Sequence, residues 1–196
     1  MGAYSPAPVL TPALLERVQR EILDATVNGM AAEGMPYVGV LYAGLMITAE
    51  GPKVVEFNCR FGDPETQVVL PRLSGDIVPI FQACCAGTLT PEQVQFDDNA
   101  CVTVVMASPG YPKSYPKGLP ITGIEAAEEN GVQVFHAGTR EGASGGLETS
   151  GGRVLTVTAC AATLPEAVAA AYAAVKQIHF PDAHYRHDIA HRALHR

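Results

Sequence analysis

The stretch VVEFNCRFGDPETQ, residues 54–67, alternates apolar and polar side chains up to a Gly-Asp-Pro turn. Successive side chains of an extended chain point to opposite faces, so this alternation predicts a β-strand with two different faces. The apolar face is formed by Val55, Phe57, Cys59 and Phe61. The polar face carries an acid, an amide and a guanidinium, namely Glu56, Asn58 and Arg60. We expect the apolar face to pack on a core and the polar face to meet solvent or a ligand.

The polar face has the donor types of a site for a hard cation. Glu56 and Asn58 lie two residues apart, about 6.6 Å along one face of a strand, so a carboxylate oxygen and an amide oxygen can converge there. Magnesium prefers oxygen ligands and keeps water or phosphate in its remaining positions. Arg60, one step further along, can meet a negatively charged group. Alternation alone also fits a half-exposed strand whose charged side chains are merely solvated, and both interpretations stay open at this point.

Composition and charge restrict the class of protein. The chain has 196 residues, of which 47% are hydrophobic and 17% charged, so it can bury a core in one medium domain or two small ones. Its formal net charge is −7, from 13 basic and 20 acidic residues, and no basic run occurs. Nucleic acid and anionic membranes need a cationic footprint on their partners, so we expect neither as a partner.

The cysteines and apolar runs predict a soluble, cytoplasmic protein. The five cysteines lie in apolar settings and form no C-x-x-C motif, which favours buried, reduced thiols over a zinc or redox site. The start, MGAYSPAP, lacks the charged and apolar regions of a signal peptide. The longest apolar run, VGVLYAGLMI, is about half of the ~20 residues that a membrane span needs.

The first part of the chain predicts a helix followed by a hairpin. Thr11 is a candidate N-cap with Pro12 at the first helical position, and apolar residues keep roughly helical spacing to about Met30. Residues 36–48 and 52–58 flank the short turn AEG, which indicates two antiparallel strands.

The remaining elements are predicted from caps, turns and periodicity. Asp76 and Thr163 are expected to cap helices, and residues 185–196 are expected to form a short basic helix or tail. The other predictions are helices at residues 65–73, 76–89 and 163–178, and strands at 100–108, 132–139 and 153–161. Composition shifts near residues 95–100, which places the predicted domain boundary there.

The motif around the turn resembles one enzyme family. The pattern R-F-G-D-P-E-x-Q is present at residues 60–67, and MGAYSPAP, PYVGVLYAGLM, VFHAGT and GGRVL also look like that family. The chain resembles glycinamide ribonucleotide synthetase, also called phosphoribosylamine–glycine ligase, of the ATP-grasp superfamily. The resemblance implies an α+β fold. Residues 1–97 would form the second lobe of an ATP-grasp domain, an antiparallel sheet with helices. Residues 98–196 would form a small, strand-rich carboxy-terminal domain with one long helix.

The resemblance also implies a reaction in de novo purine biosynthesis. ATP phosphorylates the carboxylate of glycine, and the amine of 5-phosphoribosylamine attacks the acyl phosphate to give glycinamide ribonucleotide. Glu56 and Asn58 match the metal ligands of the family, for Mg²⁺ or Mn²⁺, and Arg60 matches a catalytic arginine that faces the acyl phosphate. Asp63 and Glu65 would order the adjoining loop and touch the amine or the ribose.

Further candidates lie at strand–loop junctions. His136 and Arg153 can bind the substrate phosphate, and the backbone amides of Gly151 and Gly152 can form an anion nest beside them. A structural turn with satisfied polar side chains explains each of these residues equally well.

The resemblance covers only part of the family's length. In the family, MGAYSP lies well inside the chain, and about half of the enzyme precedes it. That preceding half carries an amino-terminal domain and the lid and lysines that hold ATP. We therefore expect the missing amino-terminal half as a partner, and no activity without it.

An alternative to the ligase is a non-catalytic binding or scaffold module derived from it. Two features of the sequence bear on the choice between them. The intact row of Glu56, Asn58 and Arg60 favours the ligase, because a scaffold has no physical need to retain it. The tail departs from the family, with Ala190 and His191 where the family usually carries glycine and an aromatic residue.

Overall fold

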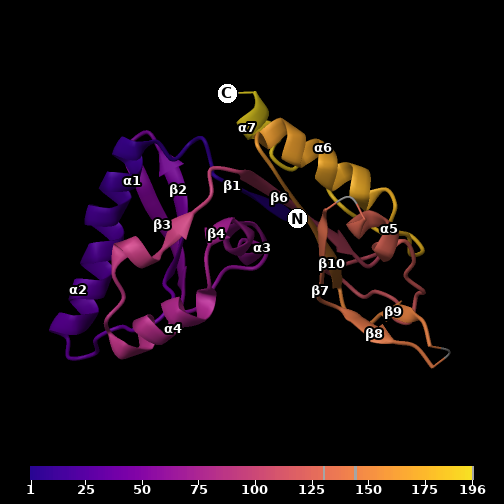
Figure 1. The fold of residues 1–196 in the computed structure, drawn as a ribbon, viewed down its shortest axis with the longest axis horizontal. Helices are drawn as coiled ribbons and strands as arrows, with labels where there is room; N and C mark the ends of the chain where they lie inside the picture. The colour runs from indigo at the N-terminus through magenta and orange to yellow at the C-terminus, as the bar shows by residue number, and fades with distance from the viewer. Residues whose placement is uncertain (130, 144, 196) are drawn as a thin grey trace. The chain divides into compact units, whose positions relative to one another are not determined.

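The computed structural model describes residues 1–129, 131–143 and 145–195, and it divides the chain into two compact units (Figure 1). The carboxy-terminal unit consists of Met1–Pro6, Asp63–Arg72 and Asp97–Arg196. The hairpin unit consists of Ala7–Gly62 and Leu73–Phe96. Helices combine with antiparallel sheets, which confirms the predicted α+β class.

An antiparallel sheet of four strands forms the centre of the carboxy-terminal unit. Its strand order is β1-β6-β10-β7. The strands are β1 (Gly2–Ser5), β6 (Ala100–Ala107), β10 (Arg153–Ala161) and β7 (Gln133–His136). All eight residues of β6 are buried, which explains its nearly unbroken apolar sequence. The predicted strands near residues 100, 132 and 153 are confirmed, whereas β1 was not predicted.

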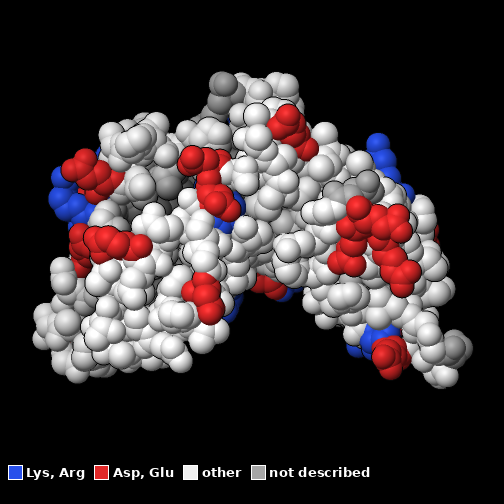
Figure 2. Space-filling view, viewed as in Figure 1, with Lys and Arg blue, Asp and Glu red and all other residues white. Residues whose placement is uncertain are grey.

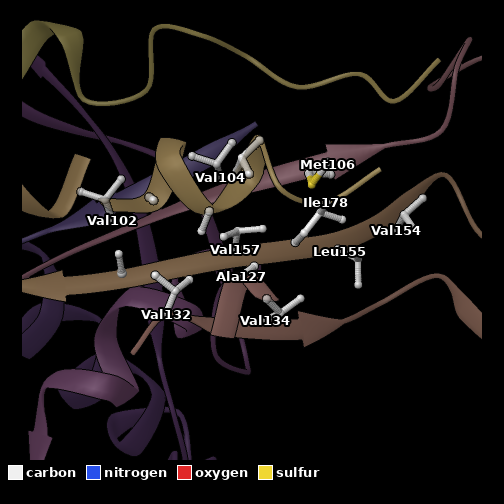
Figure 3. Packing of buried hydrophobic residues seen from close by; sticks show 14 of the residues in the cluster. Val102, Val104, Met106, Ala127, Val132, Val134, Val154, Leu155, Val157 and Ile178 are labelled. Atoms are coloured by element: carbon white, nitrogen blue, oxygen red, sulfur yellow. The ribbon is translucent and has the colours of Figure 1, made fainter. Parts of the chain in front are cut away.

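Helix α6 (Leu164–Val175) lies along this sheet and closes the core (Figures 1 and 3). It begins at the predicted cap, where the Thr163 hydroxyl accepts a bond from the Glu166 N–H, and the Glu166 carboxylate accepts one from the Thr163 N–H. Small residues, Ala167, Ala171 and Ala174, form most of its buried side. They let the helix approach the valines and Leu155 of the sheet closely.

The carboxy-terminal unit contains several shorter elements. They are α3 (Thr66–Val69), η2 (Leu70–Arg72), α5 (Ile124–Glu128), the β8–β9 hairpin (Thr139–Glu141 and Leu147–Thr149) and α7 (His191–Leu194). Cys101 and Cys160 face each other across β6 and β10 and form a disulfide, so the expectation of buried, reduced thiols is wrong for this pair. Cys59 and Cys85 are reduced but exposed, so they too differ from that expectation. A cross-strand pairing over 59 residues of sequence leaves no local signal.

The hairpin unit is built from a helical segment, a two-stranded ribbon and helix α4. Its elements are α1 (Pro12–Val18), the π-helical segment η1 (Gln19–Leu23), α2 (Asp24–Ala32), β2 (Tyr42–Thr48), β3 (Gly51–Asn58), β4 (Leu73–Ser74), α4 (Ile77–Ala86), the 3-10 helix η3 (Pro91–Gln93) and β5 (Gln95–Phe96). The predicted caps are confirmed. Thr11 accepts from the Leu14 N–H at 3.3 Å, and Asp76 accepts from the Val78 N–H at 2.9 Å.

The hairpin unit has almost no core of its own. Of the buried apolar side chains in the described residues, it holds only Val18 and Ile22, whereas it holds fourteen of the seventeen exposed large apolar ones. Glu56, Asn58 and Arg60 are called the polar row below. On the opposite face of the strand, Val55 is 67% exposed and Phe57 41% exposed, so the core expected behind the polar row is absent from the described part of the chain. A two-stranded ribbon cannot bury both of its faces without further layers.

The compact units do not follow a single cut in the sequence. The predicted division into residues 1–97 and 98–196 stays a prediction about family domains. In the structure, Met1–Pro6 and Asp63–Arg72 belong to the same compact unit as Asp97–Arg196. The reason is that β1 pairs with β6, and α3 packs beside β1 and β6.

The surface matches the low charged fraction of the sequence. Figure 2 shows one face on which uncharged residues predominate and acidic side chains are more prominent than basic ones. None of the helices in the described ranges is long and apolar enough to cross a membrane.

Candidate functional site

The β2–β3 hairpin places Glu56 and Asn58 on one face. Its register pairs Tyr42 with Asn58 and Gly44 with Glu56, and it shifts by one residue between Gly44 and Leu45. Val55 is the extra residue of this β-bulge, which separates the site end of the ribbon from its turn end. Bulges bend and twist a strand locally, and they commonly lie beside functional sites.

Hydrogen bonds join the three residues of the row. The Asn58 amide donates from Nδ2 to Glu56 Oε1 at 3.0 Å. Arg60 Nη2 donates to Asn58 Oδ1 at 3.2 Å, and Arg60 Nη1 donates to the Phe61 carbonyl at 2.7 Å. Glu56 and Arg60 are exposed and Asn58 is half-buried, so the row is open to a ligand. Glu56 and Asn58 therefore share one face of β3, as their alternation predicts, whereas Arg60 lies in the bend after the strand and joins them through its bond to Asn58.

The donor set of this row fits a hard divalent cation. Glu56 offers two carboxylate oxygens and Asn58 one amide oxygen. In the present arrangement an amide N–H lies between the two side chains. To hold a shared cation, Asn58 would have to present Oδ1 rather than Nδ2 to the side of Glu56. The described residues contain no group of three or more His, Cys, Asp or Glu placed to hold a metal, so the remaining ligands would come from phosphate and water.

An aromatic contact fixes the backbone that follows the row. The ring of Phe61 lies 6.0 Å from that of Phe81 on α4, a tilted pair. Because Arg60 donates to the Phe61 carbonyl, this contact also holds the backbone acceptor of the guanidinium in place. Of the two Arg60 hydrogen bonds, the one to Asn58 lies within the polar row, and the one to the Phe61 carbonyl anchors Arg60 to the backbone after it.

Asp63 and Arg153 come together within the carboxy-terminal unit. Their ion pair measures 2.9 Å from Arg153 Nη2 to Asp63 Oδ2, and Arg153 Nη1 donates to the Asp63 carbonyl at 3.3 Å. Gln67 donates to the other carboxylate oxygen of Asp63 at 3.2 Å. Both residues were predicted as substrate contacts, but nothing in the sequence indicated that they contact each other across 90 positions.

The remaining predicted residues, His136, Gly151 and Gly152, already make polar contacts within the protein. His136 Nδ1 lies 3.0 Å from the Thr139 hydroxyl, and the ring lines a cavity of about 530 Å³ beside α5. The Gly151 N–H donates to the Gly138 carbonyl at 3.2 Å, so this amide is not available to an anion nest. The carbonyls of Gly151 and Gly152 accept from the hydroxyl and the N–H of Ser108, each at 2.8 Å.

Glu65 lies immediately before the short helix α3, at its N-cap position. Its carbonyl accepts from the Val68 and Val69 N–H groups, each at 3.0 Å, and its side chain is half-buried. The geometry therefore places Asp63 and Glu65 in the turn that the RFGDPE motif forms, and the motif orders that turn as expected from its Gly-Asp-Pro sequence.

Comparison with sequence families divides the chain between two models of one enzyme. Residues 1–66 match the ATP-grasp (A) domain of phosphoribosylglycinamide synthetase, and residues 101–192 match the C domain of the same enzyme. The two matches cover the polar row, Asp63 and Glu65 in the first, and His136, Gly151, Gly152 and Arg153 in the second.

Several characterised proteins are similar to almost the whole chain. A phosphoribosylamine–glycine ligase from Caulobacter vibrioides is 52% identical over 195 residues, which are 99% of this chain and 46% of that protein. A trifunctional purine biosynthetic protein from Gallus gallus is 52% identical over 99% of this chain and 19% of its own length. This chain thus spans less than half the length of these relatives.

Solved structures agree with the sequence matches. The crystal structure of a phosphoribosylamine–glycine ligase from Thermotoga maritima superposes with a TM-score of 0.85 at 35% identity, over 97% of this chain and 46% of that one. The biotin carboxylase domain of a thermophilic 2-oxoglutarate carboxylase shares the fold alone, with a TM-score of 0.63 at 17% identity. This chain belongs to the phosphoribosylglycinamide synthetase family, with matches to its ATP-grasp (A) domain and to its C domain.

Proposed function

We propose that this chain is the carboxy-terminal part of a phosphoribosylamine–glycine ligase, which joins glycine to 5-phosphoribosylamine with the use of ATP in purine biosynthesis. The observation that carries the proposal is the hydrogen-bonded row of Glu56, Asn58 and Arg60 in a chain whose curated relatives are named for this reaction. The activity, its substrates and its partners are those of a longer protein, because the relatives are more than twice as long as the segment that matches.

The row supports a division of roles. Glu56 and Asn58 would hold Mg²⁺ or Mn²⁺ through their oxygens. When bound, the ion would neutralise charge on the phosphates of ATP. Arg60 would donate to the anionic oxygens of the acyl phosphate, and a preorganised guanidinium stabilises that charge without reorientation at the moment of reaction. Asp63, held by Arg153 and Gln67, orders the turn beside the substrates.

The hairpin unit supports the need for further polypeptide. A lobe with two buried apolar side chains and fourteen exposed large ones cannot hold a fixed shape on hydrophobic burial alone. We propose that the amino-terminal part of the ligase covers this surface and brings the groups that hold ATP. We also propose a cytoplasmic location; the free thiols of Cys59, Cys84 and Cys85 are compatible with it, whereas the disulfide between Cys101 and Cys160 does not support it.

A non-catalytic binding module is the second candidate, and the exposed apolar surface of the hairpin unit favours it equally. The two candidates differ in one respect. The ligase uses the polar row in turnover, whereas a binding module needs only the apolar surface.

The test combines this chain with the amino-terminal part of the Caulobacter vibrioides relative, an assembly called here the complemented ligase. We expect no glycinamide ribonucleotide from the chain alone, and ATP- and glycine-dependent product from the complemented ligase. The control is the Caulobacter vibrioides enzyme divided at the same position and reassembled. An active control with an inactive complemented ligase would contradict the ligase proposal, and turnover by the chain alone would contradict the need for a second part.

A further inference from the structure

Gly44 lies on β2 directly across from Glu56, on the face of the polar row. The register pairs Gly44 with Glu56 and, two residues along the same face, Tyr42 with Asn58. Side chains that face each other across an antiparallel ladder have Cβ atoms about 4.5–5.5 Å apart. Position 44 is therefore the place on β2 from which a side chain would meet Glu56.

The stem of Glu56 already occupies the space above Gly44. A Cβ built on Gly44 would stand 3.1 Å from Glu56 Cγ, 3.5 Å from the Glu56 carbonyl oxygen and 3.5 Å from Tyr42 Cε1. Carbon atoms in favourable contact lie about 3.5–4.0 Å apart. An added methyl group would thus have to displace Cγ by a few tenths of an ångström, and the carboxylate would move with it.

The φ angle of Gly44 gives no reason for glycine at this position. Gly44 is not among the glycines with positive φ, and it lies inside a strand. A glycine inside a regular element costs about 0.5–1 kcal/mol relative to alanine, because it loses more conformational freedom on folding. The position therefore bears a local cost that its φ angle does not explain, and two features favour glycine there: the register shift beside it and the space taken by the Glu56 side chain.

We propose that Gly44 is a positioning residue for the polar row. The missing side chain lets Glu56 lie across β2 with Oε1 against the Asn58 amide, the arrangement from which both side chains can reach one divalent cation. A side chain at position 44 shifts the Glu56 carboxylate relative to the Asn58 amide and lowers the affinity for that cation. The inference rests on the proposed function, since it assigns Gly44 to the same site.

The test uses Gly44→Ala in the complemented ligase, with Gly29→Ala as the matched control. Gly29 lies on α2 of the same unit, and a Cβ there would meet no atom within 4 Å. Changes to residues that orient metal ligands typically lower metal affinity about 10–100-fold. We expect Gly44→Ala to raise the Mg²⁺ concentration for half-maximal rate about tenfold. Turnover should recover at saturating Mg²⁺, and Gly29→Ala should match the unsubstituted protein.

Two further readouts separate positioning from folding. Binding of Mn²⁺ in the presence of ADP, followed by electron paramagnetic resonance without turnover, should weaken by the same factor in Gly44→Ala. In the complemented ligase without turnover, the Asn58 side-chain amide protons should lose the shift that their bond to Glu56 produces, and they should keep it in Gly29→Ala. An unchanged Mg²⁺ requirement, or equal changes in both variants, overturns the inference.

The proposed function can fail separately. If Glu56→Gln leaves the Mg²⁺ requirement unchanged, the row is not the metal site. If Glu56→Gln raises the requirement and Gly44→Ala does not, the metal site stands and the role of Gly44 is wrong. A Gly44→Ala variant that only melts earlier, with a normal Mn²⁺ affinity, shows that Gly44 serves packing alone and also overturns the inference.

Discussion

Arg153 and Asp63 form an ion pair of 2.9 Å across 90 positions of sequence, and the same guanidinium also contacts the Asp63 carbonyl. The arginine that was expected to bind the substrate phosphate is thus bound to the turn of the RFGDPE motif. Its two partners on Asp63 indicate that it orders this turn, because a bidentate guanidinium fixes the orientation of the group it meets.

A double-mutant cycle tests this pairing. Arg153→Gln and Asp63→Asn should each destabilise the chain slightly, and the double variant should be no less stable than the worse single one. The coupling should be about 0.5 kcal/mol, typical of a pair that is partly exposed. Urea unfolding measures it. Strict additivity of the two changes, with a raised KM for 5-phosphoribosylamine in Arg153→Gln alone, would favour the phosphate role instead.

Glu56→Gln should raise the Mg²⁺ requirement of the complemented ligase more than it changes the melting temperature. The amide has the same shape as the carboxylate but supplies a dipole where a hard cation prefers a full negative charge. Steady-state rates across a Mg²⁺ titration measure the effect. An early melt with a normal Mg²⁺ requirement would mean that the row is structural.

Arg60→Lys should leave nucleotide and metal binding intact and slow acyl transfer. Lysine keeps the charge but loses the planar fork with which Arg60 contacts both Asn58 and the Phe61 carbonyl. Removing one preorganised contact to a developing charge typically lowers turnover about 10²–10³-fold. We expect a fall of this order in kcat with little change in KM for ATP. A loss confined to KM would contradict a role in the transition state.

Arg72→Lys should destabilise the carboxy-terminal unit. The Arg72 guanidinium donates to Ser5 Oγ at 2.7 Å, to the Asn99 carbonyl at 2.6 Å and to the Asp97 carbonyl at 2.8 Å. Lysine cannot reach three acceptors in this geometry, and each lost bond to a charged group costs about 1.5–3 kcal/mol where it is not replaced by water. Chemical denaturation measures the loss. Arg140→Lys is the control, because Arg140 makes one exposed ion pair, with Glu148. Equal stability of the two variants would contradict the prediction.

Amide hydrogen exchange of the chain alone should divide along the two units. Amides of β6 and β10 should be strongly protected, since both strands lie inside the main core. Amides of β2 and β3 should exchange much faster, because their unit buries only Val18 and Ile22 among its apolar side chains in the described ranges. In the complemented ligase the protection of β2 and β3 should rise. Equal protection of all four strands in the chain alone would show that the hairpin unit is stable by itself.

Local chemistry made several elements predictable. The caps at Thr11, Asp76 and Thr163 depend on neighbours within a few positions, and the structure confirms them. The two-residue period places Glu56 and Asn58 on one face of β3, but a bulge at Val55 interrupts the alternation and the strand ends at Asn58. Arg60 lies in the bend that follows and joins the row through its hydrogen bond to Asn58. The family and the reaction class came from the RFGDPE motif and its resemblance, not from periodicity.

Features that depend on distant partners were not predictable. The pairing of β1 with β6 and the disulfide between Cys101 and Cys160 join segments far apart in sequence. The commitment of the Gly151 amide to Gly138 likewise depends on how two turns pack. The apolar face of β3 was expected to pack on a core, but Val55 and Phe57 are exposed in the structure, because a single sequence does not say whether the cover lies within the chain.

The sheet order β1-β6-β10-β7 has a consequence for any shortened form of the protein. A polypeptide that begins at residue 98 would lose β1, which occupies one border of the sheet, and β6 would become the new border. All eight residues of β6 are buried, and it carries no charged side chain or proline that would discourage pairing with another chain. An unpaired, apolar strand of this kind is a template for intermolecular β-pairing. Such a piece should therefore self-associate, even though it retains α6 and most of the main core.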